Sequence, residues 1–122
     1  MKYEFSIEKR AGYLYCKIPD RPYDRKAFIS YAQRILQESE KANITRILVD
    51  GLDVKGADLS TMERYFIGEK VAEVFAPKIK LAVAWPEKHI NRFAETVALN
   101  RGGYMHVVAT IQAAEKWLLN KL

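Results

Sequence analysis

Cysteine is almost absent from this 122-residue sequence, which contains only Cys16. A single cysteine cannot form a disulfide within the chain, and this usage is typical of a reducing compartment. No apolar run approaches the roughly 20 residues that a transmembrane helix needs. The opening residues, Met1-Lys2-Tyr3-Glu4, do not lead into a signal-peptide core. These absences predict a cytoplasmic protein without an integral membrane segment.

Signatures of catalysis are missing as well. The sequence has neither a Gly-x-Ser-x-Gly elbow nor a glycine-rich phosphate loop. Its two histidines, His89 and His106, are not spaced as a pair of metal ligands. Cys16 lies on an apolar strand face, so we expect its thiol to be buried and inert. We therefore predict no catalytic residue, no enzyme activity and no cofactor.

Positive charge is in excess but is not concentrated. The net charge is +5 and the isoelectric point is about 9.3, with basic residues dispersed among acidic ones. One cluster contains Arg21, Arg25, Lys26 and Arg34. Nucleic-acid binding requires a basic stripe with stacking aromatic residues. We interpret the cluster as solvated surface and predict no nucleic-acid partner.

The apolar content is that of a globular protein. Hydrophobic residues make up 49% of the sequence and charged residues 29%, which predicts a single domain spanning residues 1–122. Alternating patterns predict two neighbouring strands that form an antiparallel hairpin, followed by strands that alternate with helices. The prediction is an α/β fold with a mixed five-stranded sheet and four helices. The expected strands are residues 2–8, 13–18, 44–50, 79–84 and 104–109, and the expected helices are residues 25–42, 60–75, 90–98 and 110–122.

Local signals support the helices. Asp24, Ser60 and Thr110 stand where an N-cap is expected, and Glu63 completes a capping-box spacing with Ser60. Gly68 lies inside the second helix, where glycine costs about 1 kcal/mol relative to alanine. We therefore expect a close approach of a neighbouring strand at this glycine. The expected buried face of the second helix is Tyr65, Gly68, Ala72 and Phe75.

Two strands carry polar or small residues on one of their faces. If these faces lie on the same side of the sheet, helices cover that side less than the other. The residues are Tyr13, Tyr15 and Lys17 on one strand and Lys80, Ala82 and Ala84 on the other.

The crossover that follows the strand at residues 44–50 is the candidate site. In open α/β sheets, ligands bind where strands end at their carboxyl edge and helices begin. Three acidic residues crowd this region and could bind Mg²⁺ or Ca²⁺, but their spacing does not fit a calcium loop, so no metal site is predicted. Trp85 follows the next strand and, with Tyr65, Phe66 and Ile67, could line an apolar pocket, although core packing is the commoner role. The candidate ligand or partner surface is Asp50, Asp53, Asp58, Ser60, Thr61, Arg64 and Trp85.

The chain resembles the STAS and SpoIIAA-like fold, which is shared with anti-sigma-factor antagonists. The resemblance is carried by the hairpin start and by residues 47–51, 80–84, 97–102 and 113–118, the last two resembling small SpoIIAA-like bacterial and archaeal proteins. It implies a SpoIIAA-like β-α superhelix and a non-enzymatic regulatory module that acts on a protein partner or as a homodimer. The same superhelix occurs in lipid-carrying CRAL-TRIO (Sec14-like) domains, which implies a carrier of a small apolar or lipid-like ligand as the alternative.

The best-known STAS members are switched by phosphorylation at the start of the second helix, within an Asp-Ser-Ser/Thr-Gly sequence. Residues 58–62 of this chain read Asp-Leu-Ser-Thr-Met, so the hydroxyls are present but the glycine is not. Ser60 and Thr61 are therefore the candidate phosphoacceptors implied by the resemblance. The favoured interpretation is that Ser60 is simply an N-cap.

Overall fold

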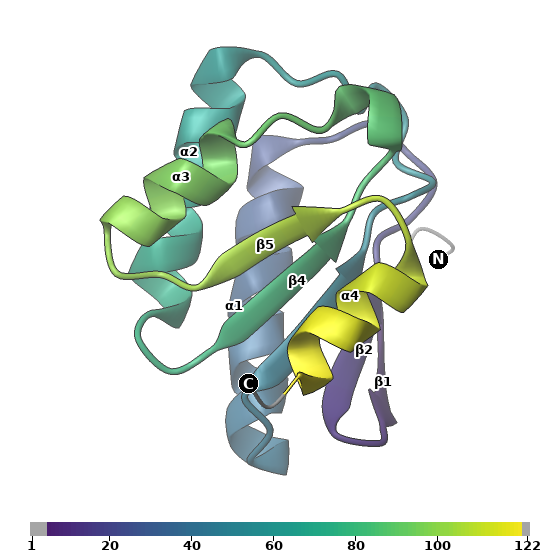
Figure 1. The fold of residues 1–122 in the computed structure, drawn as a ribbon, viewed down its shortest axis with the longest axis vertical. Coiled ribbons are helices and arrows are strands. Elements are labelled where there is room, and N and C mark those ends of the chain that lie inside the picture. The colour runs from purple at the N-terminus through teal and green to yellow at the C-terminus, as the bar shows by residue number, and fades with distance from the viewer. Residues whose placement is uncertain (1–4, 121–122) are drawn as a thin grey trace.

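The computed structural model describes residues 5–120 and confirms the predicted α/β fold. Five strands form one mixed sheet in the order β1-β2-β3-β4-β5 (Figure 1). The hairpin of β1 and β2 is antiparallel, and β2 through β5 are parallel. The strands are β1 (Ser6–Arg10), β2 (Tyr13–Lys17), β3 (Arg46–Asp50), β4 (Lys80–Ala84) and β5 (Met105–Val108).

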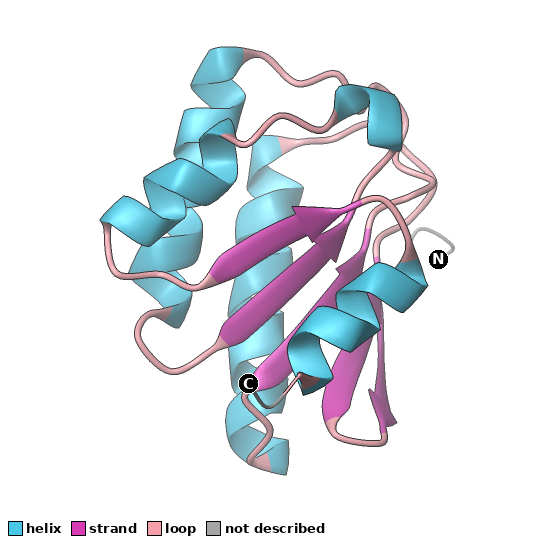
Figure 2. Ribbon diagram, in the orientation of Figure 1, coloured by secondary structure: helices cyan, strands magenta, loops and turns pink. Residues whose placement is uncertain are grey.

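Four helices and one short 3-10 turn complete the structure, and they are unevenly divided between the two sides of the sheet (Figure 2). The three helices that connect parallel strands lie on one side, as right-handed crossovers in a progressive strand order require. The last helix lies on the opposite side. The helices are α1 (Arg25–Ala42), α2 (Thr61–Phe75), α3 (Phe93–Asn100) and α4 (Ile111–Leu119), and the 3-10 turn is Glu87–His89.

Helix ends follow the predicted capping residues. The side chains of Asp24, Ser60 and Thr110 accept hydrogen bonds from the backbone N–H groups of the residues three positions later, at 3.0, 3.2 and 3.0 Å. The helix predicted from residue 90 begins only at Phe93, because the chain first forms the 3-10 turn. The N–H of Phe93 then donates to the side chain of Asn91 at 3.0 Å. The first predicted strand extends into residues 1–4, which lie outside the described residues.

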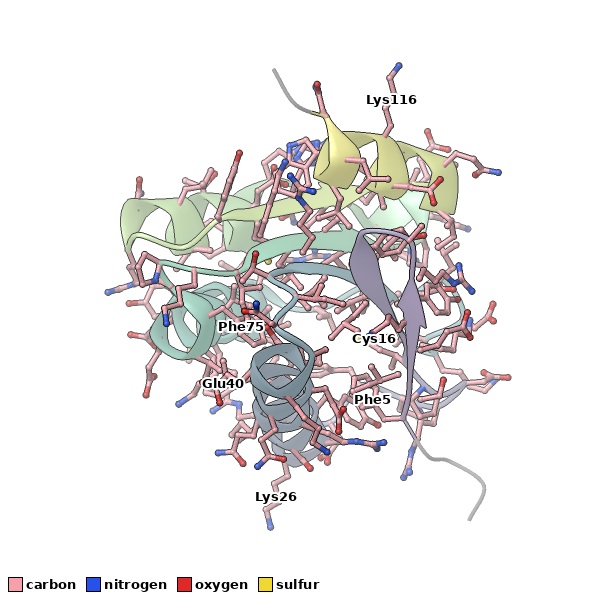
Figure 3. All side chains as sticks on the ribbon, turned by 90° about the horizontal axis from the view of Figure 1, so that it is seen from below. Phe5, Cys16, Lys26, Glu40, Phe75 and Lys116 are labelled. Atoms are coloured by element: carbon pink, nitrogen blue, oxygen red, sulfur yellow. The ribbon has the colours of Figure 1, made fainter. Side chains whose placement is uncertain are left out.

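Strand alternation gives the sheet two different apolar faces. Leu14, Ile47 and Leu81 are buried on the face covered by α1, α2 and α3. On the other face, Leu48 and Ala82 pack with buried residues of α4. Figure 3 shows α1 and α4 on opposite sides of the sheet, with Cys16 on the α1 side. The cysteine is 0% exposed, which confirms that it is buried, and burial raises the pKa of its thiol to about 12.

The two polar or small strand faces do coincide. Tyr15 is in register with Leu48, which is in register with Ala82, so all three point to the α4 side. Among the described helices, α4 alone packs on this side, where it contacts β3, β4 and β5. Helices therefore cover this side of the sheet less than the other, as predicted, although Tyr13 of β2 is buried against α4.

The prediction for Gly68 was right about a close approach but wrong about the neighbour. A Cβ at Gly68 would lie 2.3 Å from the carbonyl oxygen of Ala94 and 2.8 Å from Cβ of Val97, both in α3. The contact is thus between two helices. Gly68, Ala72 and Phe75 are buried as predicted, but the prediction was wrong for Tyr65, which is 40% exposed, while Arg64 is buried instead.

Within residues 5–120, none of the helices combines the length and the apolar character that crossing a bilayer requires.

Candidate functional site

The carboxyl ends of β2, β3 and β4 meet at one edge of the sheet, where the candidate residues lie (Figure 1). The structure does not bring these residues into one site. It divides them between the two sides of the sheet and adds a cavity that the sequence indicated only through Trp85.

Asp50 and Asp53 form a polar cluster on the α4 side. Asp50 is buried, and its carboxylate accepts hydrogen bonds from the hydroxyl of Tyr15 and, at 3.1 Å, from the N–H of Leu52. Nζ of Lys17 lies 2.8 Å from the carboxylate of Asp53 and 3.6 Å from that of Asp50. The hydrogen bond from Lys17 lowers the pKa of Asp53, whereas burial and the bond to Asp50 raise the pKa of Tyr15. Both carboxylates are thus engaged within the protein.

Arg64 fastens the start of α2 to the loop after β4. Its guanidinium Nε donates to the carbonyl of Leu59 and its Nη2 to the carbonyl of His89, both at 2.9 Å. The carboxylate of Asp58 lies 3.9 Å from Nη2 of Arg64, and the side chain of Asp58 is 80% exposed. Because Arg64 is buried and bonded to two carbonyls, it holds two loops together and does not present its charge to an anion in solution.

Ser60 and Thr61 remain at the surface. The hydroxyl of Ser60 caps α2, and Thr61 is the first residue of that helix. In a complete capping box, the carboxylate of Glu63 would accept the backbone N–H of Ser60. Here that carboxylate accepts hydrogen bonds from Tyr23 and Arg25 instead. The next residue, Met62, is 74% exposed.

Histidine and carboxylate meet at the β5 edge. Nδ1 of His106 lies 2.8 Å from the carboxylate of Glu95, which also accepts the N–H of Val107 at 3.2 Å and is paired with Arg92. Burial alone would raise the pKa of Glu95, but these hydrogen bonds lower it. The group occupies backbone bonding sites along an edge strand, which protects that edge from pairing with another chain. Among residues 5–120, no three carboxylate, imidazole or thiol groups gather closely enough to hold a metal ion.

Trp85 lies across the carboxyl end of β3. Its indole N–H donates to the carbonyl of Ala57 at 3.0 Å. A Cβ at Gly51 would be 2.7 Å from two atoms of the indole ring, so only glycine leaves room for this placement. Gly51 directly follows the last residue of β3. Its contact with Trp85 depends on the pairing of two strands and has no local signal.

An apolar cavity of about 110 Å³ lies between the sheet and the first two crossover helices. Val49 and Val83 form part of its floor, Phe28 and Ile67 approach from α1 and α2, and Trp85 lies at the carboxyl edge. The predicted pocket at Trp85 and Ile67 therefore exists. Phe66 is not part of it, because its ring packs under the guanidinium of Arg25, with 4.2 Å between Cζ and the ring centroid. Tyr65 does not line it either and is 40% exposed.

The cavity opens toward the carboxyl edge. Residues 21–24, which follow β2, line it together with Val54 and Trp85. Val83 points inward from a central strand, yet it is only partly buried, as are Ile18 and Phe28. Inward side chains of a central parallel strand are normally covered on both faces. Their partial exposure shows that the space above them is unfilled.

A small network ties α1 to α2 beside this opening. The hydroxyl of Tyr23 donates to Glu63 at 2.9 Å, and Arg25 donates to the same carboxylate at 2.7 and 3.2 Å. Hydrogen bonds from Arg25 lower the pKa of Glu63, and burial together with Glu63 raises the pKa of Tyr23. We call Tyr23, Arg25 and Glu63 the entrance network. Sequence reasoning missed it, since its members are 38 and 40 residues apart.

No protein-family model matches this chain, and no curated protein matches it. The STAS-like and SpoIIAA-like assignment therefore stays a prediction that rests on the residues quoted for it.

Proposed function

We propose that this protein binds a small apolar ligand in the cavity between the sheet and α1 and α2. The single observation that carries the proposal is the unfilled apolar volume of about 110 Å³. Protein cores pack as densely as organic crystals and leave few voids larger than a water molecule. An engineered apolar cavity of about 150 Å³ stays dry and binds benzene, so the observed volume suits a ligand.

The position of the cavity supports the same function. It opens at the carboxyl edge of a parallel sheet, where α/β proteins bind ligands. Partly exposed Val83, Ile18 and Phe28 would be covered by an apolar guest, and covering apolar surface contributes about 25 cal/mol per Å². A carrier of a small apolar or lipid-like ligand was the alternative drawn from the superhelix that CRAL-TRIO domains share, and the cavity supports binding of a small apolar ligand.

A matched pair of substitutions tests the proposal. Val83 and Val107 are register partners on β4 and β5, and only Val83 lines the cavity. Purified wild-type protein, Val83→Phe and Val107→Phe are compared by thermal denaturation with benzene, toluene, 1-decanol and dodecanoic acid. A compound at a hundred times its dissociation constant should stabilise the wild type and Val107→Phe by about 2.7 kcal/mol. Val83→Phe should lose that effect, because its ring occupies the cavity.

Two results would contradict the proposal. If none of the four compounds stabilises the wild-type protein, the cavity is not a binding site. If Val83→Phe is stabilised as strongly as the wild type, binding takes place elsewhere.

We also propose, as a second candidate, a STAS-like interaction module centred on the start of α2. It is favoured by the exposure of Met62 (74%) and Tyr65 (40%) beside the exposed hydroxyls of Ser60 and Thr61. A second copy of the chain or a regulatory protein would cover these side chains. A phosphate on Ser60 would lie at the N-terminus of α2, where the helix dipole favours negative charge.

Sedimentation equilibrium tests the homodimer form of this candidate. The expected result is a concentration-dependent dimer that Met62→Asp disrupts and that Lys116→Asp does not, since Lys116 is in α4, on the other side of the sheet from α2 (Figure 3). A wild-type protein that remains monomeric at every concentration, or a dimer unaffected by Met62→Asp, would contradict it.

A further inference from the structure

We infer that the ligand is an uncharged, ring-sized hydrocarbon-like molecule, such as a single substituted aromatic ring, and not an ionised compound or a long acyl chain. This inference rests on the proposed function, and it follows from the volume, the lining and the charges of the cavity.

Volume sets the size of the guest. Pockets for drug-sized ligands enclose about 300–1,000 Å³, whereas this cavity holds about 110 Å³. It is closer to the engineered cavity of about 150 Å³ that binds benzene. A long chain could be enclosed completely only if α1 or α2 moved, and the entrance network holds these helices together through Glu63.

The lining sets the polarity of the guest. The exposed surface inside the cavity is almost wholly apolar. In the described part of the chain, every buried side-chain nitrogen or oxygen already has a hydrogen-bond partner. A polar group carried into the interior would lose its bonds to water and gain none, which is unfavourable.

The rim adds no net charge that could hold an ion. Arg21 and Asp24 carry opposite charges at the opening, and Asp24 is already bonded to the N–H of Ala27. Arg25 and Glu63 form a salt bridge at 2.7 Å. A carboxylate or an ammonium group at the opening would therefore meet charges that are balanced within the protein.

Aromatic rings favour a ring-shaped guest. Phe5, Phe28, Tyr31, Phe75 and Trp85 all line the cavity. Aromatic pairs gain free energy beyond area burial when they adopt tilted or offset arrangements. An aromatic guest can adopt such an arrangement with several of these rings.

Three probes separate charge from length, and each is titrated into the full-length protein by isothermal calorimetry or by protein NMR. Toluene is an uncharged ring, benzoate is a charged ring, and 1-decanol is an uncharged chain. We expect toluene to bind wild type and Val107→Phe, and to bind Val83→Phe at least about tenfold more weakly. Benzoate and 1-decanol should bind the wild type roughly a hundredfold more weakly than toluene, or not at all.

The outcomes separate a failure of this inference from a failure of the proposed function. If 1-decanol binds the wild type, is weakened by Val83→Phe, and toluene does not bind, the cavity is a ligand site but the inferred size of the ligand is wrong. If benzoate binds as tightly as toluene, the inferred absence of charge is wrong. If no probe binds, both the inference and the proposed function fail.

Discussion

The two sides of the sheet are packed in different ways. On the α4 side, Ala82 and Ala84 of β4 and Ala114 of α4 are each 0% exposed, and these small side chains let the helix lie close to the strands. On the opposite side, α1 and α2 carry large aromatic and aliphatic side chains, yet a volume of about 110 Å³ stays unfilled. Large side chains such as Phe28 and Phe75 line this volume without filling it.

Short side chains in the lining of the cavity help to explain the unfilled volume. Ala27 and Ala32 of α1 line the cavity, as do Val49 and Val83 of the sheet. The comparison shows that small residues have opposite effects in the two places. Where a helix can move inward they produce close packing, and where its neighbours hold it apart they leave a cavity.

The same substitution on the two sides should have the most different effects. Ala114→Leu places three extra carbons in a closely packed face and should lower the free energy of unfolding by about 1–3 kcal/mol. Ala32→Leu places them against the cavity, so it should leave that free energy unchanged or raise it by up to about 2 kcal/mol. Urea denaturation measures both. Equal losses of unfolding free energy in the two variants would contradict the proposed difference in packing between the two sides of the sheet.

Gly51→Ala should disturb the cavity from its edge. The new Cβ would lie 2.7 Å from the indole of Trp85, so the ring must move. We expect a loss of about 1–2 kcal/mol in the free energy of unfolding and a changed Trp85 fluorescence spectrum. A Trp117→Phe background leaves Trp85 as the only tryptophan and makes the spectrum specific. An unchanged spectrum in that background would show that Trp85 is not held against Gly51.

The smallest effect should be a pH dependence of the entrance network. The pKa of Glu63 is lowered in the folded protein, mainly by hydrogen bonds from Arg25. The stabilisation is therefore complete above the ordinary glutamate pKa of 4.5 and is lost as pH falls through the lower folded value. Thermal unfolding of wild type and Glu63→Gln, followed from neutral to acidic pH, should give curves that converge at low pH. Curves that stay parallel would mean that Glu63 does not stabilise the α1–α2 contact.

The fold was predictable because its signals are local. Alternation at Tyr13–Ile18, helical spacing after Asp24 and the cap at Ser60 each involve neighbours along the chain. One part of the site had such a signal, since Trp85 follows directly on a buried strand and was predicted to line a pocket.

The rest of the site depends on contacts between distant residues. Whether Asp50 joins Asp58 depends on which side of the sheet each faces, and pairing of Asp50 with Tyr15 places it on the α4 side. The bond from Tyr23 to Glu63 joins residues 40 positions apart. The volume of the cavity is the volume enclosed between the packed helices and the sheet minus the volume of the side chains that fill it. No sequence pattern encodes that difference.

The most direct test of the central claim is a crystal structure determined from crystals exposed to xenon or toluene vapour. The account predicts electron density for the guest between Phe28, Val83 and Trp85, with these side chains where the empty protein has them. A structure in which the Phe28 or Trp85 ring has turned inward to fill the space, so that no guest enters, would contradict it.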